Sequence, residues 1–195
     1  MTGKDYFKYY RAVTVVDTSG RERKALRYYG DYYCNLLYGK QLVAGKASLM
    51  LETLLTIAVY VFLATRNVPL NREGFASAFC VLMVFPLFFV TIGTLAYLIS
   101  PEKLNINQYR SSIRFVGLGA VSLVAVSGLS GAIALVTWLI HFPTAAPEGY
   151  IVVILCYGVI AGIATAIRKT INSIPFRIEK GILSDDDEKE QINNV

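Results

Sequence analysis

Four long apolar stretches dominate the hydrophobic pattern of the chain. They cover residues 47–64, 75–99, 115–140 and 150–167. Each reaches the roughly 18–20 residues that a helix rising 1.5 Å per residue needs to cross about 30 Å of hydrocarbon. Inside lipid every backbone polar group needs a partner within its own segment, so each stretch is predicted to be a helix. We therefore expect an all-α polytopic membrane protein with one transmembrane domain over 47–167.

Residues 1–46 follow a different pattern. Two strand-like runs, "FKYYRAVTVV" and "RERKALRYYG", flank the turn "DTSG", and this arrangement predicts a β-hairpin over 8–29. A lone two-stranded hairpin is only marginally stable in water, so we expect it to rest on lipid headgroups, on the rest of the chain or on a partner. Residues 31–45 are predicted to form a short amphipathic helix at the membrane interface, with Asp31 as its N-cap.

Positive charge divides unevenly between the connections of the predicted spans. Nine Lys and Arg residues precede the first span, three lie between the second and third, and five follow the fourth, whereas the other two connections hold only two. Connections rich in Lys and Arg stay in the cytoplasm. We therefore expect both termini there, in an integral protein of a bacterial cytoplasmic membrane. The cytoplasmic tail, 168–195, ends in an acidic, apolar-poor run that we expect to be disordered.

The composition argues against several classes of function. Only 17% of the residues are charged, against about 25% in soluble domains. Cys34, Cys80 and Cys156 form no C-x-x-C pair, and His141 is the only histidine. A zinc site needs about four ligands with at least two close in sequence, so we expect no metal and no other cofactor. Cys80 and Cys156 lie inside apolar stretches and are interpreted as small buried hydrophobic residues.

Glu52 is the only acidic residue inside a predicted span. A carboxylate in the bilayer is costly to bury and marks an ion or proton site by default. Its position resembles the first-helix Glu of the small four-helix multidrug transporters, which exchanges protons for cationic drug. The surrounding "LMLETLLTI" lacks the aromatic pattern of that family, and this chain is far longer. Glu52 lies about one and a half turns inside the span, where it can reach the interface or pair with Lys46. We therefore favour a structural role and keep ion or proton coupling as the alternative.

The run "GLSG", residues 128–131, resembles the G-x-S-G around the serine of rhomboid intramembrane proteases. Those proteases have at least six spans and a histidine on another helix. Here His141 follows Ser130 on the same predicted helix, about 16 Å further along. The two side chains cannot meet within one chain, so we expect no enzymatic activity.

Small residues follow one face of each of the last two predicted helices. Such residues let helix backbones approach closely, which favours helix association in lipid. We predict that the third and fourth helices pack tightly through Gly117, Ala120, Ser127, Gly131 and Ala134 of the third helix and Gly158, Gly162 and Ala166 of the fourth. Pro86 removes a backbone donor midway along the second span and is predicted to bend that helix near Leu82.

Tyrosine and basic residues concentrate before the first span. Eight of the thirteen tyrosines fall within the first 38 residues. Tyrosine favours the headgroup layer, and in a hairpin it also marks cross-strand packing or a protein interface. No nucleic-acid-binding motif accompanies the cluster, so we expect no nucleic acid partner. The predicted partner or lipid surface comprises Tyr9, Arg11, Val13, Arg27, Tyr29, Tyr32 and Tyr33.

These patterns favour a non-enzymatic accessory or scaffold subunit that packs with or docks other membrane or cytoplasmic proteins. We expect it to contact the lipid bilayer and either a protein partner or further copies of itself. The alternative is a small oligomeric transporter or channel subunit that uses Glu52 and the bend at Pro86. A membrane enzyme acting on lipid is least favoured, because the sequence lacks the Asp, His and Ser clusters that such enzymes need.

Overall fold

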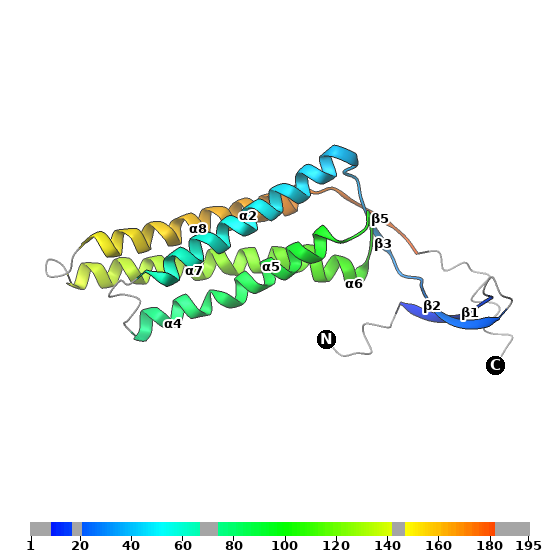
Figure 1. Ribbon diagram of the computed structural model, residues 1–195, viewed down its shortest axis with the longest axis horizontal. Coiled ribbons are helices and arrows are strands. Elements are labelled where there is room, and N and C mark those ends of the chain that lie inside the picture. The colour runs from blue at the N-terminus through cyan, green and yellow to red at the C-terminus, as the bar shows by residue number, and fades with distance from the viewer. Residues whose placement is uncertain (1–8, 17–20, 67–73, 142–146, 182–195) are drawn as a thin grey trace.

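The computed structural model describes residues 9–16, 21–66, 74–141 and 147–181, which form an elongated helical bundle with two small sheets at one end (Figure 1). The turn of the predicted hairpin, 17–20, and the acidic end of the predicted tail, 182–195, lie outside the described residues.

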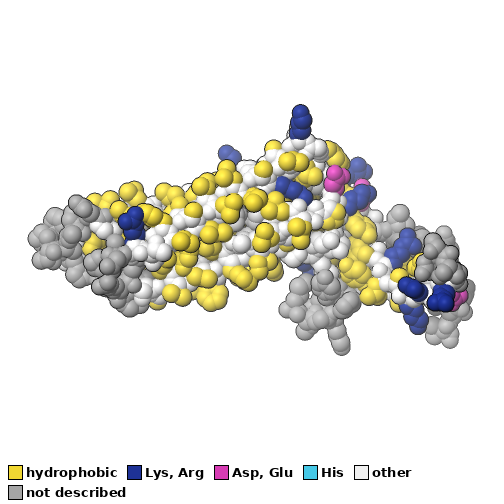
Figure 2. Space-filling model, in the orientation of Figure 1, with side chains coloured by type: hydrophobic (Ala, Val, Ile, Leu, Met, Phe, Trp, Pro, Cys, Tyr) yellow, Lys and Arg dark blue, Asp and Glu magenta, His cyan; other side chains and the backbone are white. Residues whose placement is uncertain are grey.

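Four helical segments run along the bundle, and each is long and apolar enough to span a membrane. The first span is α2 (Gly39–Thr65), and the second consists of α4 (Gly74–Leu82) and α5 (Val84–Leu98). The third span contains α7 (Phe115–His141), and the fourth is α8 (Pro147–Ser173). Hydrophobic side chains cover most of the outer surface of the bundle (Figure 2), as lipid contact requires. The predicted fold with four spans is confirmed, and the chain is a multi-pass membrane protein.

The second span is interrupted at Met83, between α4 and α5. Pro86 follows within one turn and has no N–H to donate to the carbonyl of Leu82. The helical ladder continues around this gap, because the N–H groups of Met83 and Leu87 donate to the carbonyls of Phe79 and Met83, both at 3.2 Å. The interruption falls where Pro86 predicts a bend.

Helices α7 and α8 form the most extensive helix pair of the bundle, as predicted. Among the small residues of α7, Ala120, Ser127 and Ala134 are buried. A Cβ atom added to Gly131 would lie 3.6 Å from the Cβ of Tyr157 on α8, which is ordinary contact. The small face of α7 therefore contributes to this packing in part.

The predicted small-residue face of α8 is wrong. Gly158, Gly162 and Ala166 are exposed, and a Cβ added to either glycine, or to Gly117 of α7, would meet no atom within 4 Å. Helix α8 packs against both α2 and α7, so its buried face is the one turned toward these two helices. Its buried face accordingly carries Val153, Cys156, Tyr157, Ile160, Ala164, Ile167 and Ile171.

Two glycines without room for a Cβ lie elsewhere, at the crossing of α5 and α7. A Cβ added to Gly93 would lie 2.8 Å from the backbone nitrogen of Val116, and one added to Gly119 would lie 2.9 Å from the carbonyl oxygen of Pro86. Backbone atoms cannot yield as a flexible side chain can. Glycine is therefore required at both positions, neither of which the sequence analysis singled out.

The predicted N-terminal hairpin is present. Strand β1 (Tyr10–Val16) pairs antiparallel with β2 (Glu22–Tyr28), so that Tyr10 lies opposite Tyr28. The hairpin projects beyond the end of the bundle (Figure 1). Its β2 strand is exposed from Glu22 to Arg27.

The predicted interfacial helix over 31–45 is wrong. Strand β3 (Tyr32–Asn35) lies there instead, between β4 (Lys103–Asn105) and β5 (Phe176–Glu179) in an antiparallel three-stranded sheet. "YYCN" suits a pleated, half-buried surface, and the two partner strands come from distant parts of the chain that local patterning does not reveal.

The start of α2 also differs from the sequence prediction. Helix α2 begins at Gly39, with Tyr38 rather than Asp31 at the N-cap. Gly39 has φ +53°, a left-handed conformation that glycine adopts at no steric cost. The chain therefore turns sharply out of the sheet into a helix that is continuous with the first span.

Two short elements connect the sheet to the third span. Strand β4 leads into α6 (Ile106–Tyr109), where Asn105 and Gln108 form a reciprocal capping box. The π-helical turn η1 (Arg110–Arg114) then runs into α7.

Candidate functional site

The hairpin carries the residues that the sequence predicted as a partner surface. Side chains of paired residues share one face of an antiparallel ladder and alternate along each strand. The register therefore places three cross-strand pairs on one face. We call this the arginine face; its pairs are Arg11 with Arg27, Val13 with Ala25, and Val15 with Arg23.

Charge on the arginine face is of one sign. Glu22, the only acidic residue of the two strands, belongs to the opposite face by the same register. Arg11 and Arg27 lie directly across from each other, and like charges in that position destabilise a sheet. The guanidinium of Arg11 lies 5.8 Å from the ring centre of Tyr29, so one tyrosine extends the face.

The end of the hairpin that carries Arg11 and Arg27 is held to the chain by tyrosines. The ring of Tyr28 contacts those of Tyr10 and Tyr32 at centroid distances of 5.2 and 5.0 Å. The Tyr28 hydroxyl accepts a hydrogen bond from the N–H of Ile106 at 3.1 Å and donates to the carbonyl of Asp31 at 2.9 Å. Burial raises the pKa of this hydroxyl above its ordinary value. The hairpin is thus anchored at one end on its own chain.

Three of the predicted surface residues have structural contacts. The ring of Tyr9 contacts that of Tyr28 at 6.3 Å, and the Tyr9 carbonyl accepts a hydrogen bond from the N–H of Tyr29. Tyr32 contacts Tyr28, as described above, and Tyr33 stacks on Tyr109 with centroids 4.1 Å apart. The candidate partner surface therefore reduces to the arginine face with Tyr29.

The three-stranded sheet forms a platform between the hairpin and the spans. Lys103 of β4 and Glu179 of β5 form a 2.9 Å salt bridge across the central strand. The thiol of Cys34 lies buried in that strand, and burial together with its hydrogen bond to Glu179 raises the pKa of the thiol. Lys103 holds the pKa of the Glu179 carboxyl below its ordinary value. Asn35 ties the sheet to α5 by donating to the Tyr97 hydroxyl at 2.9 Å.

Glu52 lies at the same end of the bundle. Its Oε1 accepts hydrogen bonds from the hydroxyls of Thr170 at 3.0 Å and Ser48 at 3.3 Å. Its Oε2 is buried, with no hydrogen-bond partner among the described residues. Thr170 lies near the end of α8 at Ser173, so the carboxylate is close to the hairpin end of the spans rather than at their centre.

Lys46 is not the partner of Glu52. Its ammonium donates to the carbonyls of Leu98 and Ser100, both at 3.0 Å, and lies 5.4 Å from the ring centre of Tyr97. Lys46 thus binds the last carbonyls of α5, where the helix end carries partial negative charge. The pairing of Lys46 with Glu52, one of the alternatives that the sequence left open, does not form, because these carbonyls hold the lysine.

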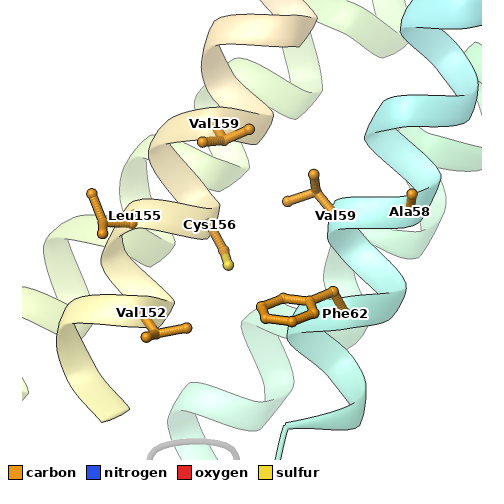
Figure 3. Close-up of a pocket in the computed structure, with 7 residues that line it drawn as sticks. All are labelled: Ala58, Val59, Phe62, Val152, Leu155, Cys156 and Val159. Carbon is orange, nitrogen blue, oxygen red and sulfur yellow. The ribbon is translucent and has the colours of Figure 1, made fainter. Parts of the chain in front are cut away.

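An apolar groove lies between α2 and α8, toward the end of the bundle away from the hairpin. In Figure 3 the side chains of Phe62 and Cys156 point toward each other across the space between the two helices. The groove has a volume of about 400 Å³. Its lining residues are Ala58, Val59 and Phe62 of α2 and Val152, Leu155, Cys156 and Val159 of α8. Sequence analysis did not find it, because the pattern of each helix does not say where two helices separate.

The described residues hold no group of three or more His, Cys, Asp and Glu side chains arranged to bind a metal ion. Among them, the features with chemical character are therefore the arginine face, the Glu52 cluster and the apolar groove. Comparison with protein-family models, curated proteins and solved structures gives no match to this chain.

Proposed function

We propose that the chain is a non-enzymatic accessory subunit of a membrane assembly that docks an acidic protein through the arginine face. The observation that carries this proposal is the direct opposition of the half-buried Arg11 and the exposed Arg27 on the hairpin. The hairpin gives up stability to hold these charges together. A partner with carboxylates at this position would remove the repulsion and add charge-assisted hydrogen bonds.

A protein partner is favoured over a lipid surface by the position of the hairpin. The tyrosine contacts around Tyr28 and the sheet hold it beyond the end of the bundle (Figure 1). Attraction to anionic lipid falls off within a Debye length of about 8 Å. A face carried away from the membrane gains little from lipid charge but is open to a neighbouring protein.

The proposed orientation places the hairpin, the sheet and both termini in the cytoplasm. Seventeen of the nineteen Lys and Arg residues fall on that side of the four spans. Figure 2 shows most of the visible Lys and Arg side chains gathered toward the hairpin end. This asymmetry supports the orientation, and a bacterial cytoplasmic membrane remains the proposed location.

A matched pair of charge reversals tests the docking surface. Arg11→Glu with Arg27→Glu reverses the arginine face, whereas Lys24→Glu on the opposite face of β2, combined with Lys40→Glu at an exposed position of α2, makes the same change in net charge away from it. The full-length chain is purified in gentle detergent, and a co-purifying protein is identified, prepared and titrated back. The face variant should weaken binding at least about tenfold, since close interfacial charge pairs are worth about 1.5 kcal/mol or more. The control should bind nearly as the unchanged chain does.

Two other results would count against the proposal. Equal loss of binding in both variants would indicate attraction to net charge alone. Binding of the purified chain to vesicles only when they contain acidic lipid, abolished by the face variant and with no protein partner, would identify the arginine face as a lipid surface.

A second candidate function rests on Glu52. One oxygen of its carboxylate is buried without a hydrogen-bond partner among the described residues, and a partly satisfied carboxylate in a span is characteristic of proton-coupled carriers. On this reading the chain is a small oligomeric transporter or channel subunit in which Glu52 binds the proton or cation. The measurement that separates the two functions is substrate-driven proton flux in vesicles reconstituted with the purified chain.

A further inference from the structure

The chain leaves the three-stranded sheet directly against the base of the hairpin. Strand β5 runs from the bundle toward the hairpin (Figure 1). Beyond it, the N–H of Gly181 donates a hydrogen bond to Oδ1 of Asp31 at 3.2 Å. A Cβ added to Gly181 would collide with the carbonyl oxygens of Tyr29 and Gly30, so the two backbone segments are in direct contact. The residues after Gly181 therefore start beside Tyr29, which extends the arginine face.

The sequence that follows Gly181 carries charge opposite to that of the arginine face. Residues 182–195 lie outside the described residues and contain five acidic residues and one lysine. We call this segment the acidic tail; its acidic residues are Asp185, Asp186, Asp187, Glu188 and Glu190. Neither Arg11 nor Arg27 forms a salt bridge with another described residue. Carboxylates bind guanidinium groups through paired, charge-assisted hydrogen bonds, so the tail supplies groups that match both arginines.

The acidic tail is long enough to reach the arginine face. Its acidic residues follow Gly181 by four to nine positions, and an extended chain covers about 3.3 Å per residue, so they reach about 13–30 Å from Gly181. Arg27 precedes Tyr29 by two positions of the hairpin ladder, which is about 7 Å. Arg11 lies directly opposite Arg27. Both guanidinium groups are therefore within reach of several tail carboxylates at once.

We propose that the acidic tail is the ligand of the arginine face while the chain has no partner, and that an acidic partner must displace it. The displacement rests on the proposed docking function, whereas the contact itself does not. A ligand on the same chain has an effective concentration in the millimolar range. Carboxylates beside Arg11 and Arg27 also remove the repulsion between these two charges. The tail therefore excludes weak acidic ligands, and only a partner that binds more tightly gains access to the face.

Disulfide formation in the full-length chain, purified in detergent without any partner, measures the contact. In a chain whose native cysteines are replaced by alanine, Gln191→Cys is combined with either Val15→Cys or Thr14→Cys. Both hairpin positions are exposed, but only Val15 belongs to the arginine face. Under mild oxidation the disulfide within one chain should form several-fold faster from position 15 than from position 14.

Charge variants separate a specific contact from random encounters of the tail with the hairpin. Arg11→Glu with Arg27→Glu should remove the difference in rate, whereas Lys24→Glu with Lys40→Glu, which changes net charge equally, should preserve it. Replacing the four acidic residues 185–188 by their amides should also remove the difference. Replacing the same four residues by lysine in the face variant should restore it, because the two charges are then exchanged.

A fluorescent peptide with the sequence of residues 182–195 tests the competition for the face. It should bind the chain with the neutralised tail at least several-fold more tightly than the unchanged chain, because the face of the unchanged chain is already occupied. Equal binding of the peptide by the two chains would show that the tail does not cover the face.

Two further results would overturn the proposal. Equal disulfide rates from positions 14 and 15, or a difference that persists after the tail is neutralised, would show that charge does not hold the tail on the arginine face. Disulfides that join two chains, at a rate that rises with chain concentration, would show that the tail of a second copy is the ligand. Neither measurement contains a protein partner, so these failures are distinct from a failure of the docking function, which the charge reversals with the co-purified protein detect.

Discussion

Polar side chains at the hairpin end of the bundle bind groups that are distant in sequence. Lys46 contacts carbonyls at the end of α5, and Glu52 contacts Thr170 near the end of α8. The sequence identified Glu52 as unusual for a span and gave Lys46 as one possible partner, a pairing that the structure does not contain. A lysine and a carboxylate six positions apart on a helix do not lie on one face, so tertiary contacts determined their partners.

Glu52→Gln should leave folding and assembly largely intact. The amide oxygen can still accept the hydrogen bonds of Thr170 and Ser48, and the substitution removes a charge that is only partly satisfied. Thermal unfolding in detergent should shift little, whereas Glu52→Leu should lower stability by about 1 kcal/mol because it leaves the half-buried Thr170 hydroxyl without its Glu52 acceptor. Loss of proton-coupled flux in the Gln variant at unchanged expression would instead support the transporter reading.

The thiol of Cys34 should react slowly with iodoacetamide and become reactive only at high pH. Its folded-state pKa is raised by burial and by Glu179. The folded chain therefore holds this proton more tightly than the unfolded chain, and the sheet loses stability as pH rises through the ordinary thiol pKa. In a chain with Cys80 and Cys156 replaced by Ala, alkylation should be far slower than after denaturation. Adding Glu179→Gln to this chain should speed the alkylation of Cys34. Equal alkylation rates with and without this substitution would show that the carboxylate has no effect on the thiol.

The opposite pH dependence applies to Glu179 itself. Lys103 lowers the pKa of this carboxyl, so its stabilising effect is present above the ordinary Glu pKa and is lost as pH falls through the lowered value. The pair is largely exposed, and its contribution is therefore small. Acid should thus loosen β5 from the sheet without affecting the spans.

At the scale of elements, the sequence predicts what depends on local pattern. Span length and apolar content determine the four transmembrane helices, and Pro86 determines the interruption at Met83. Two strand-like runs on either side of the turn "DTSG" determine the hairpin. Local pattern does not predict which side of a helix contacts its neighbours. Small residues at 3–4 spacing on α8 resemble a packing face, but Gly162 is exposed.

Glycine substitutions provide a direct comparison between predicted and observed packing. Gly93→Ala and Gly119→Ala each place a Cβ within 3 Å of backbone atoms, so each should lower thermal stability in detergent by about 1–3 kcal/mol, the usual cost of overpacking. Gly162→Ala should be neutral or stabilising, because its added methyl meets open space and alanine favours helix. Equal effects at all three positions would contradict the assignment of the α5–α7 crossing.

At the scale of the whole molecule, the proposed orientation in the membrane is argued from charge rather than from contacts. In a chain whose native cysteines are replaced, Ala146→Cys in the connection between α7 and α8 should react with a membrane-impermeant thiol reagent added to intact cells. Glu102→Cys, which is exposed beside the sheet, should react only after the membrane is opened. The reverse pattern would place the hairpin outside the cell.

The central position of β3 has a consequence for biogenesis. This strand is synthesised before any span, but its neighbours β4 and β5 follow the second and the fourth span respectively. Long-range pairing of this kind forms late, because the intervening chain must first be placed. The complete sheet can therefore form only after the fourth span has been made, whereas the contacts from Asn105 and Ile106 that hold the tyrosines of the hairpin require only the first two spans. Under the proposed function, a nascent chain that ends before the second span would thus present no ordered docking surface, and we expect partner recruitment to begin only after that span has been made.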